Sequence, residues 1–211
     1  VIIKQLFGGL GYNFANPAIV GRIAMALGFT GAMTSYTYPE NGIDALASAT
    51  PLAVEETAQN AGSYVTLLLG NHGGVLGETC AITILVGGLF LIGTKVISPT
   101  IPVTYLATVA VFSLLCGYDP IYQLLSGGLL LGAFFMATDY VTSPTTTKGK
   151  LIFGLGLGII TCAIRFLGTM AEGVSFSILL MNLTVPYIEV LTRQDRLGIA
   201  KVKKNKEGAG K

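Results

Sequence analysis

The sequence has few of the residues from which soluble enzymes build metal and acid–base sites. It contains no Trp, one His and three Cys, and only 11% of its 211 residues are charged, against about 25% in an ordinary soluble domain. The single histidine, His72, excludes a multi-histidine metal site. Cys80, Cys116 and Cys162 lack paired metal-ligand spacing, so they are expected to be apolar packing residues or, for one of them, part of a cluster completed by another subunit.

Hydrophobic residues are abundant instead. They make up 52% of the chain, and the mean hydropathy is +0.68, which is typical of a polytopic membrane protein. Because one span needs about 20 apolar residues, the chain has room for about six or seven. The run at 64–70 is too short to cross and is expected to be interfacial or half-membrane. The expected spans are approximately 15–38, 75–94, 101–118, 121–138, 151–171 and 174–192.

The expected fold is therefore an all-α transmembrane helical bundle. Many of the 28 glycines fall inside the spans, where small residues let helix backbones approach in lipid. Two similar glycine-rich stretches, 73–78 and 127–132, would fit an inverted repeat with broken helices. Two such matches in a glycine-rich chain also arise by chance.

Charge placement predicts the orientation of the spans. The tail at 193–211 is rich in Lys and Arg, and such residues next to a span favour the cytoplasm. Counting back through the spans places Lys148, Lys150 and Lys95 inside. It places the segment at about 39–74, which has no Lys or Arg, outside. We therefore expect a membrane domain at 1–192 with one extracytoplasmic segment, followed by a basic cytoplasmic tail.

Two polar segments interrupt the apolar runs and are candidate ligand sites. Asn13 and Asn16 lie one helical turn apart in a stretch rich in Gly and Pro, and their amides could bind a ligand. The alternative is a helix N-terminus with Asn16 as N-cap and Pro17 at the first position. Asp139 ends a span, either as a boundary residue in water or as a partly buried carboxylate that lines a site.

Arg165 is a charge inside the apolar run from 151 to 170. Such a charge costs about 2.5–3.5 kcal/mol at the centre of a membrane helix. It is expected either to snorkel to the outer surface or to pair with an anion, such as Glu172 or a cofactor phosphate. The sequence has no phosphate-binding glycine loop of the nucleotide-hydrolase type and no basic patch interleaved with aromatics, so ATP-driven transport and nucleic-acid binding are not expected.

Together these segments resemble a known family of membrane redox proteins. The stretches at 8–22, 44–53, 73–112 and 126–189 are similar to the RnfD subunit of the Rnf electron-transport complex and to its paralogue, the NqrB subunit of the sodium-translocating NADH:quinone reductase. The hydroxyl-rich stretch at 142–149 resembles the Rnf version more. The family has further spans upstream, so the start at Val1 without an initiator Met is expected to be internal.

The resemblance implies a covalent flavin at Thr50. In the family, a membrane flavin transferase joins FMN through its phosphate to a Thr in the segment that corresponds to 44–50, which makes the subunit a phosphoprotein. Asp44, Ala49 and Thr50 match the family pattern, whereas Ala47 and Ser48 depart from it. By the predicted topology, this FMN would lie on the extracytoplasmic side.

The resemblance also implies a second site and a function. Asn13, Asn16 and Asp139 match positions that line a non-covalent flavin or riboflavin site. The implied function is that of an electron-carrying subunit of a ferredoxin:NAD+ oxidoreductase in a prokaryotic inner membrane, coupled to transport of Na+ or H+. Its partners would be other Rnf subunits with iron–sulfur centres and flavins, and no catalytic residue or metal ligand is expected in this chain.

Two alternatives stay open. One is the quinone-reductase subunit, which has a different electron partner. The other is a channel or transporter without redox chemistry, in which Asn13, Asn16 and Asp139 bind a solute and Thr50 is an unmodified loop residue.

Overall fold

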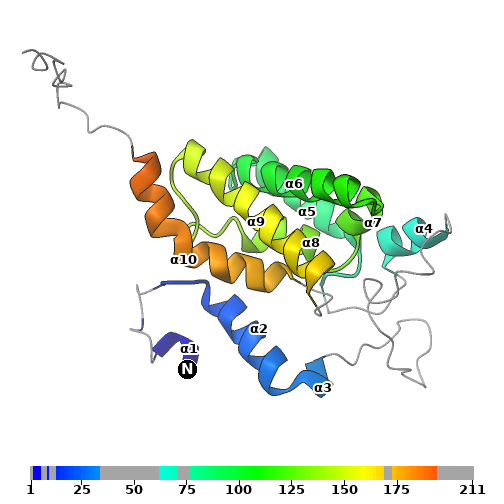
Figure 1. Cartoon of the computed structure of the whole chain (residues 1–211), viewed down its shortest axis with the longest axis horizontal. Helices are drawn as coiled ribbons and strands as arrows, with labels where there is room; N and C mark the ends of the chain where they lie inside the picture. The colour runs from blue at the N-terminus through cyan, green and yellow to red at the C-terminus, as the bar shows by residue number, and fades with distance from the viewer. Residues whose placement is uncertain are drawn as a thin grey trace, which may run out of the picture.

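The computed structural model is helical throughout the part of the chain that it describes, which is residues 2–5, 9, 13–33, 62–70, 77–168 and 173–193 (Figure 1). The expected all-α class is confirmed. The first four helices are α1 (Ile2–Gln5), α2 (Pro17–Gly28), α3 (Thr30–Met33) and α4 (Gly62–Leu69). They are followed by α5 (Ala81–Gly93), α6 (Thr100–Cys116), α7 (Pro120–Leu125), α8 (Leu129–Leu131), a π-helix η3 (Gly132–Met136), α9 (Thr147–Leu167) and α10 (Val174–Thr192).

The helices have the lengths and surfaces of a membrane bundle. Within the described residues, α9 and α10 are long and apolar enough to cross a membrane, and α2, α5 and α6 are shorter apolar helices. Large apolar side chains such as Phe90 and Leu115 are exposed on the outside of this bundle, which suits contact with lipid. Helix α4 has only eight residues, so the expectation that this run is too short to cross is confirmed.

Helices α6 and α9 run parallel and pack most closely. A Cβ placed on Gly154 would lie 1.9 Å from the Thr104 hydroxyl oxygen, and one on Gly158 would lie 2.4 Å from the Thr108 Cβ. Both contacts advance four residues along each helix, which fixes the parallel direction. The two glycines therefore allow the backbones to approach to a distance that any side chain would prevent.

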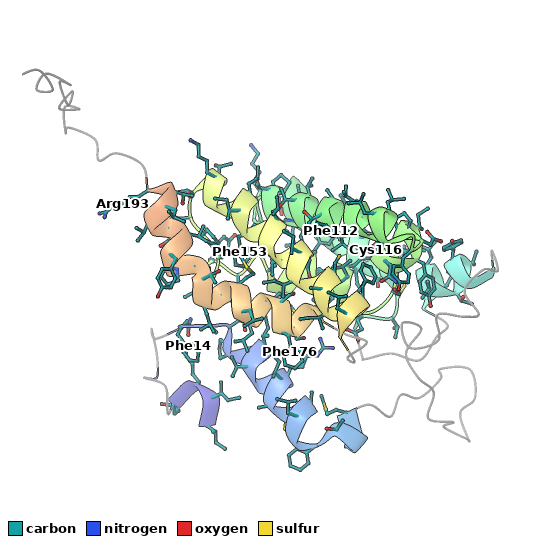
Figure 2. The ribbon with its side chains drawn as sticks, in the orientation of Figure 1. Phe14, Phe112, Cys116, Phe153, Phe176 and Arg193 are labelled. Carbon is teal, nitrogen blue, oxygen red and sulfur yellow. The ribbon has the colours of Figure 1, made fainter. Side chains whose placement is uncertain are left out.

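Helix α10 packs antiparallel against α9 and completes the core. Thr146 at the start of α9 donates to Thr192 at the end of α10, while Thr161 near the end of α9 donates to Ser177 near the start of α10. Phe153, Leu157 and Ile178 are fully buried among these helices. Figure 2 shows Phe153 within the bundle and Arg193 at the far end of α10.

The expected span at 121–138 is not one helix, and this corrects the sequence-based boundaries. Helix α7 ends at Leu125, and the chain turns at Ser126–Gly128, where Gly127 adopts a left-handed φ of 64°. It continues as the short α8 and the π-helix up to Met136. Two consecutive glycines favour the turn because Gly adopts positive φ without steric cost. The result is a broken helix, as the glycine-rich stretch suggested.

Helix α10 is also interrupted, and α2 packs against its side. Pro186 lies inside α10, has no N–H to give to the carbonyl of Asn182, and bends a helix at this point. The bend is visible in Figure 1, where α2 lies below the first half of α10. The first residues of α2 therefore meet α10 near its middle, far from either end of the bundle.

Candidate functional site

Thr50 and its motif from Asp44 to Pro51 lie outside the described residues. The same is true of His72, Glu172 and the tail beyond Arg193. The described residues do include Asn13, Asn16, Asp139 and Arg165, so the expected second site can be built from them.

Asn16 forms the N-cap of α2, as one of the two sequence interpretations predicted. Its side-chain oxygen accepts from the Ala18 N–H at 3.0 Å, and Pro17 occupies the first helical turn. The Asn13 side-chain oxygen accepts a hydrogen bond from the ammonium group of Lys4. Both amide oxygens are therefore engaged by the protein, and the NH2 groups are what the two side chains can offer a ligand.

Asn182 on α10 joins this segment to the Asp139 segment. Its side chain is 3% exposed. In the amide orientation that satisfies both neighbours, its nitrogen donates to the Thr142 carbonyl at 3.2 Å and its oxygen accepts from the Asn16 N–H at 3.3 Å. Asn16 and Thr142, which are far apart in sequence, thus hydrogen-bond to the same side chain.

Asp139 follows the π-helix and is held by its own loop. Its carboxylate accepts from the Thr142 hydroxyl at 2.9 Å, and its carbonyl accepts from the Ser143 N–H at 3.1 Å. The carboxylate is half-buried. The interpretation as a partly buried carboxylate therefore holds, and one of its oxygens is directed by Thr142.

The loop after Asp139 is fastened at both sides. The Tyr140 hydroxyl donates to the Val96 carbonyl, while Thr145 donates to Glu189 on α10 through its N–H and its hydroxyl, at 3.3 and 3.2 Å. Thr146 caps α9 by accepting from the Gly149 N–H. The hydroxyl-rich sequence at 142–149 thus supplies the hydrogen bonds of an irregular backbone, as buried backbone in a membrane requires.

Arg165 binds the broken helix, which neither sequence interpretation anticipated. Its guanidinium donates to the Gln123 carbonyl at 2.8 Å, to the Gln123 side chain at 3.1 Å and to the Ser126 carbonyl at 3.2 Å. These carbonyls belong to the last turn of α7, where no intrahelical donor exists. A cation also interacts favourably with the negative end of a helix, which explains this charge within an apolar run.

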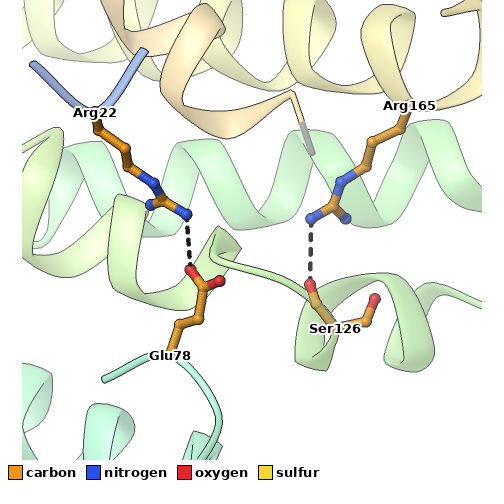
Figure 3. A network of polar contacts seen from close by, with 4 residues as sticks. All are labelled: Arg22, Glu78, Ser126 and Arg165. Carbon is orange, nitrogen blue, oxygen red and sulfur yellow. Dashed lines mark hydrogen bonds and ion pairs between the residues drawn. The ribbon is translucent and has the colours of Figure 1, made fainter. Parts of the chain in front are cut away.

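Arg22 on α2 and Glu78 before α5 form an ion pair that the sequence reasoning missed. Their side-chain nitrogen and oxygen lie 3.4 Å apart, and the Glu78 side chain is 5% exposed. Figure 3 shows this pair beside Arg165 and Ser126. A signal was available in the sequence, because a charge next to or within an apolar run is rarely left without a partner.

A buried hydroxyl cluster links the three core helices. The hydroxyls of Tyr105 on α6 and Thr161 on α9 lie 2.6 Å apart, Thr161 donates to Ser177 on α10 at 2.8 Å, and Ser177 donates to the Val174 carbonyl. All three side chains are fully buried. Each hydroxyl has a partner, so the cluster stabilises helix contacts in lipid.

The short helix α4 is attached near the end of α6. The Tyr64 hydroxyl donates to the carboxylate of Asp119, which also caps α7. This hydrogen bond, together with partial desolvation and the negative charge of Asp119, raises the pKa of Tyr64. Since the folded-state pKa lies above the ordinary value, the contact is fully present at neutral pH and is lost only at alkaline pH.

Among the described residues, no group of three His, Cys, Asp or Glu side chains could hold a metal ion. Cys80, Cys116 and Cys162 are free thiols. The two segments that the sequence singled out are instead brought together around Asn182, with amide donors on one side and a carboxylate acceptor on the other.

Comparison with known proteins gives the family. The family model described as "NQR2, RnfD, RnfE family" matches residues 1–198. The chain is 47% identical over 96% of its length to the RnfD subunit of the Na(+)-translocating ferredoxin:NAD(+) oxidoreductase complex of Acetobacterium woodii, and 41% identical over 93% to the proton-translocating counterpart of Clostridium ljungdahlii. It spans 65% of each of these proteins.

A more distant relative is covered to a similar extent. The corresponding subunit of the ion-translocating oxidoreductase complex of Cronobacter sakazakii is 36% identical over 92% of this chain and 68% of that protein. Because the family model covers nearly the whole sequence and these relatives match it almost from end to end, this membrane protein belongs to the NQR2, RnfD, RnfE family.

Proposed function

We propose that the chain forms the membrane part of the RnfD subunit of an ion-translocating ferredoxin:NAD+ oxidoreductase. The observation that carries this proposal is the high identity to relatives with that name, which extends along almost the whole chain. In this role the protein passes electrons among flavins and the iron–sulfur centres of partner subunits. The complex resides in a prokaryotic inner membrane, with the basic tail in the cytoplasm.

The first flavin of the proposal is FMN, joined to Thr50 through a phosphoester. A flavin transferase attaches it on the extracytoplasmic side. This attachment uses the phosphate and leaves the ring system of the flavin unmodified. Asp44, Ala49 and Thr50 support the assignment because they match the family pattern at the positions nearest the acceptor hydroxyl.

A denaturing gel tests this attachment. In-gel flavin fluorescence should follow the purified chain and disappear in Thr50→Ala, while Thr57→Ala, in the same segment, should retain it. A wild-type chain without fluorescence would reject covalent flavin and would favour the channel or transporter alternative.

The second flavin of the proposal binds without a covalent bond, as FMN or riboflavin, at Asn13, Asn16 and Asp139. The residues fit such a ligand, because the two amides present NH2 donors and the half-buried carboxylate presents an acceptor. A flavin ring edge carries carbonyl acceptors on both sides of an N–H donor. When bound, the flavin supplies the electron transfer itself.

The chain's own residues bind and orient in this scheme. Lys4 and the start of α2 fix the two amides, Thr142 fixes one oxygen of Asp139, and the packed π-helix excludes water on one side. The proposed electron transfer needs no general acid, base or nucleophile from these residues.

Coupling to Na+ or H+ movement is proposed to pass through Asp139 and the adjacent phenylalanines. Phe134 is buried, and Phe135 is half exposed, directly before the carboxylate. A change in flavin charge near Asp139 would bias this apolar constriction between closed and open states. In an Asp139→Asn complex with normal electron flux, ion pumping should fall, and unchanged pumping would reject this role.

The paralogous quinone-reductase subunit is the second candidate, because the family model includes it. The named relatives favour the ferredoxin-linked complex. Electron transfer from reduced ferredoxin to NAD+ in purified membranes, compared with NADH-driven quinone reduction, distinguishes the two.

A further inference from the structure

The buried amide of Asn182 lies where three interruptions of regular backbone meet. Helix α2 begins at Asn16 and Pro17, the stretch around Thr142 is not helical, and α10 contains Pro186 one turn beyond Asn182. Asn182 is near the middle of α10, a helix long enough to span a membrane. At such depth, backbone polar groups have no water to bind and must be satisfied by protein.

Asn182 satisfies one backbone group from each of the two candidate-site segments. Its side-chain oxygen takes the N–H of Asn16, and its side-chain nitrogen gives a hydrogen bond to the carbonyl of Thr142. Thr142 in turn directs its hydroxyl to Asp139. The distance between the amide donors and the carboxylate therefore depends on one planar side chain with two hydrogen bonds.

We propose that Asn182 is the positioning residue of the second flavin site, and that it sets the spacing of Asn16 and Asp139 by binding both segments. This inference rests on the proposed non-covalent flavin site. Asn182 does not need to touch the flavin. It acts through Asn16 and through Thr142, and a ligand that bridges the two segments binds tightly only when their spacing is fixed in advance.

The structure also separates this role from ordinary packing. An apolar side chain of similar volume would fill the same space between α10 and its neighbours, yet it would leave the Asn16 N–H and the Thr142 carbonyl without this partner. Asp at the same position would keep the acceptor for Asn16 and lose the donor for Thr142. The two substitutions thus remove both connections or only one.

The experiment uses the whole purified complex with Asn182→Leu, Asn182→Asp and wild type. Acid-released flavin measures the non-covalent cofactor, and in-gel fluorescence measures the covalent one on the same samples. Riboflavin or FMN is then titrated into flavin-depleted complexes to obtain the Kd. Gln123→Leu is the matched control, because it removes another buried amide, 2% exposed, from a different part of the bundle.

We expect the Kd for added flavin to rise about tenfold or more in Asn182→Leu and about threefold in Asn182→Asp, with covalent flavin unchanged in both. Gln123→Leu should keep the wild-type Kd even if its thermal midpoint falls. A pure packing role would instead leave the Kd unchanged in the Asn182→Asp complex, because size and shape are retained.

Each other outcome decides against a specific statement. A wild-type Kd in Asn182→Leu, while Asp139→Asn or Asn13→Ala loses flavin, overturns the role of Asn182 and leaves the second flavin site intact. Equal loss of covalent and non-covalent flavin in both Asn182 variants would assign the residue to folding alone. A wild-type complex without non-covalent flavin would remove the site itself, and this inference with it.

Discussion

At the scale of single residues, the closest helix contact depends on the absence of one methyl group. A Cβ on Gly158 would lie 2.4 Å from the Cβ and 2.5 Å from the Cγ2 of Thr108. Neither atom is the end of a flexible side chain, so the clash can be relieved only by moving a helix. Packing at this density leaves little room for such a shift.

Gly158→Ala is therefore expected to destabilise the protein by about 1–3 kcal/mol, as overpacking does. The measurement is the thermal midpoint in detergent, followed by size-exclusion fluorescence. Gly93→Ala is the control, because a Cβ there would meet nothing within 4 Å. A midpoint for Gly158→Ala equal to that of Gly93→Ala would contradict the close approach of α6 and α9.

The ion pair of Arg22 and Glu78 gives a second prediction at this scale. Removing one member leaves a charge in a poorly solvated place, at a cost of about 3–5 kcal/mol for fully buried pairs. We expect Arg22→Met to lower the thermal midpoint more than the double variant Arg22→Met/Glu78→Leu does. Additive losses in the double variant would mean that the two charges do not interact.

Residue-level prediction from sequence succeeded where the physics is local. The Asn16–Pro17 pair predicted a helix start, because capping involves only neighbouring backbone groups. It did not identify Asn182, whose partners are 40 and 166 positions away along the chain. A polar amide inside an apolar span was nevertheless a signal, because such residues are costly in lipid.

At the scale of elements, the broken helix at 120–136 is the main departure from the sequence-based spans. Its first part ends with carbonyls that have no intrahelical donors, and Arg165 on α9 binds two of them. The apolar run predicted a span but gave no indication of the break's partner. The charge that is out of place in one apolar helix completes the end of another.

Arg165→Met should therefore loosen the turn at Ser126–Gly128 by removing charged hydrogen bonds of about 1.5–3 kcal/mol each, part of which is offset by lost desolvation. Limited proteolysis should cleave this turn faster, and the thermal midpoint should fall. Arg165→Lys should restore part of the loss, since Lys is a point charge without the planar fork. The exposed Arg193→Gln serves as control, and equal behaviour of all three variants would refute the role.

At the scale of the whole molecule, the helix directions agree with one arrangement across a membrane. Parallel α6 and α9 both run toward the end of the bundle that holds Cys116, α7 and α4, and α10 returns to the end with Arg193 (Figures 1 and 2). Lys148 and Lys150 lie at the Arg193 end. The basic residues thus share one side, as the orientation rule requires.

A labelling experiment checks this arrangement in intact cells. With Cys80 and Cys162 replaced by Ala, an impermeant maleimide should label the exposed Cys116 from outside. In a variant with Lys148→Cys as the single cysteine, labelling should require permeabilised cells. Labelling of both positions from the same side would reverse or break the predicted topology.

The sequence by itself determined the helical class, the membrane setting, the cap of α2 and the family, because composition, local hydrogen bonding and ordered motifs are properties of the chain alone. Only the tertiary structure decided where helix 120–136 breaks, what Arg165 binds and that Asn182 joins two distant segments. The physical reason is that lipid supplies no hydrogen bonds, so each interruption of a helix has to be satisfied by residues that the sequence leaves far away.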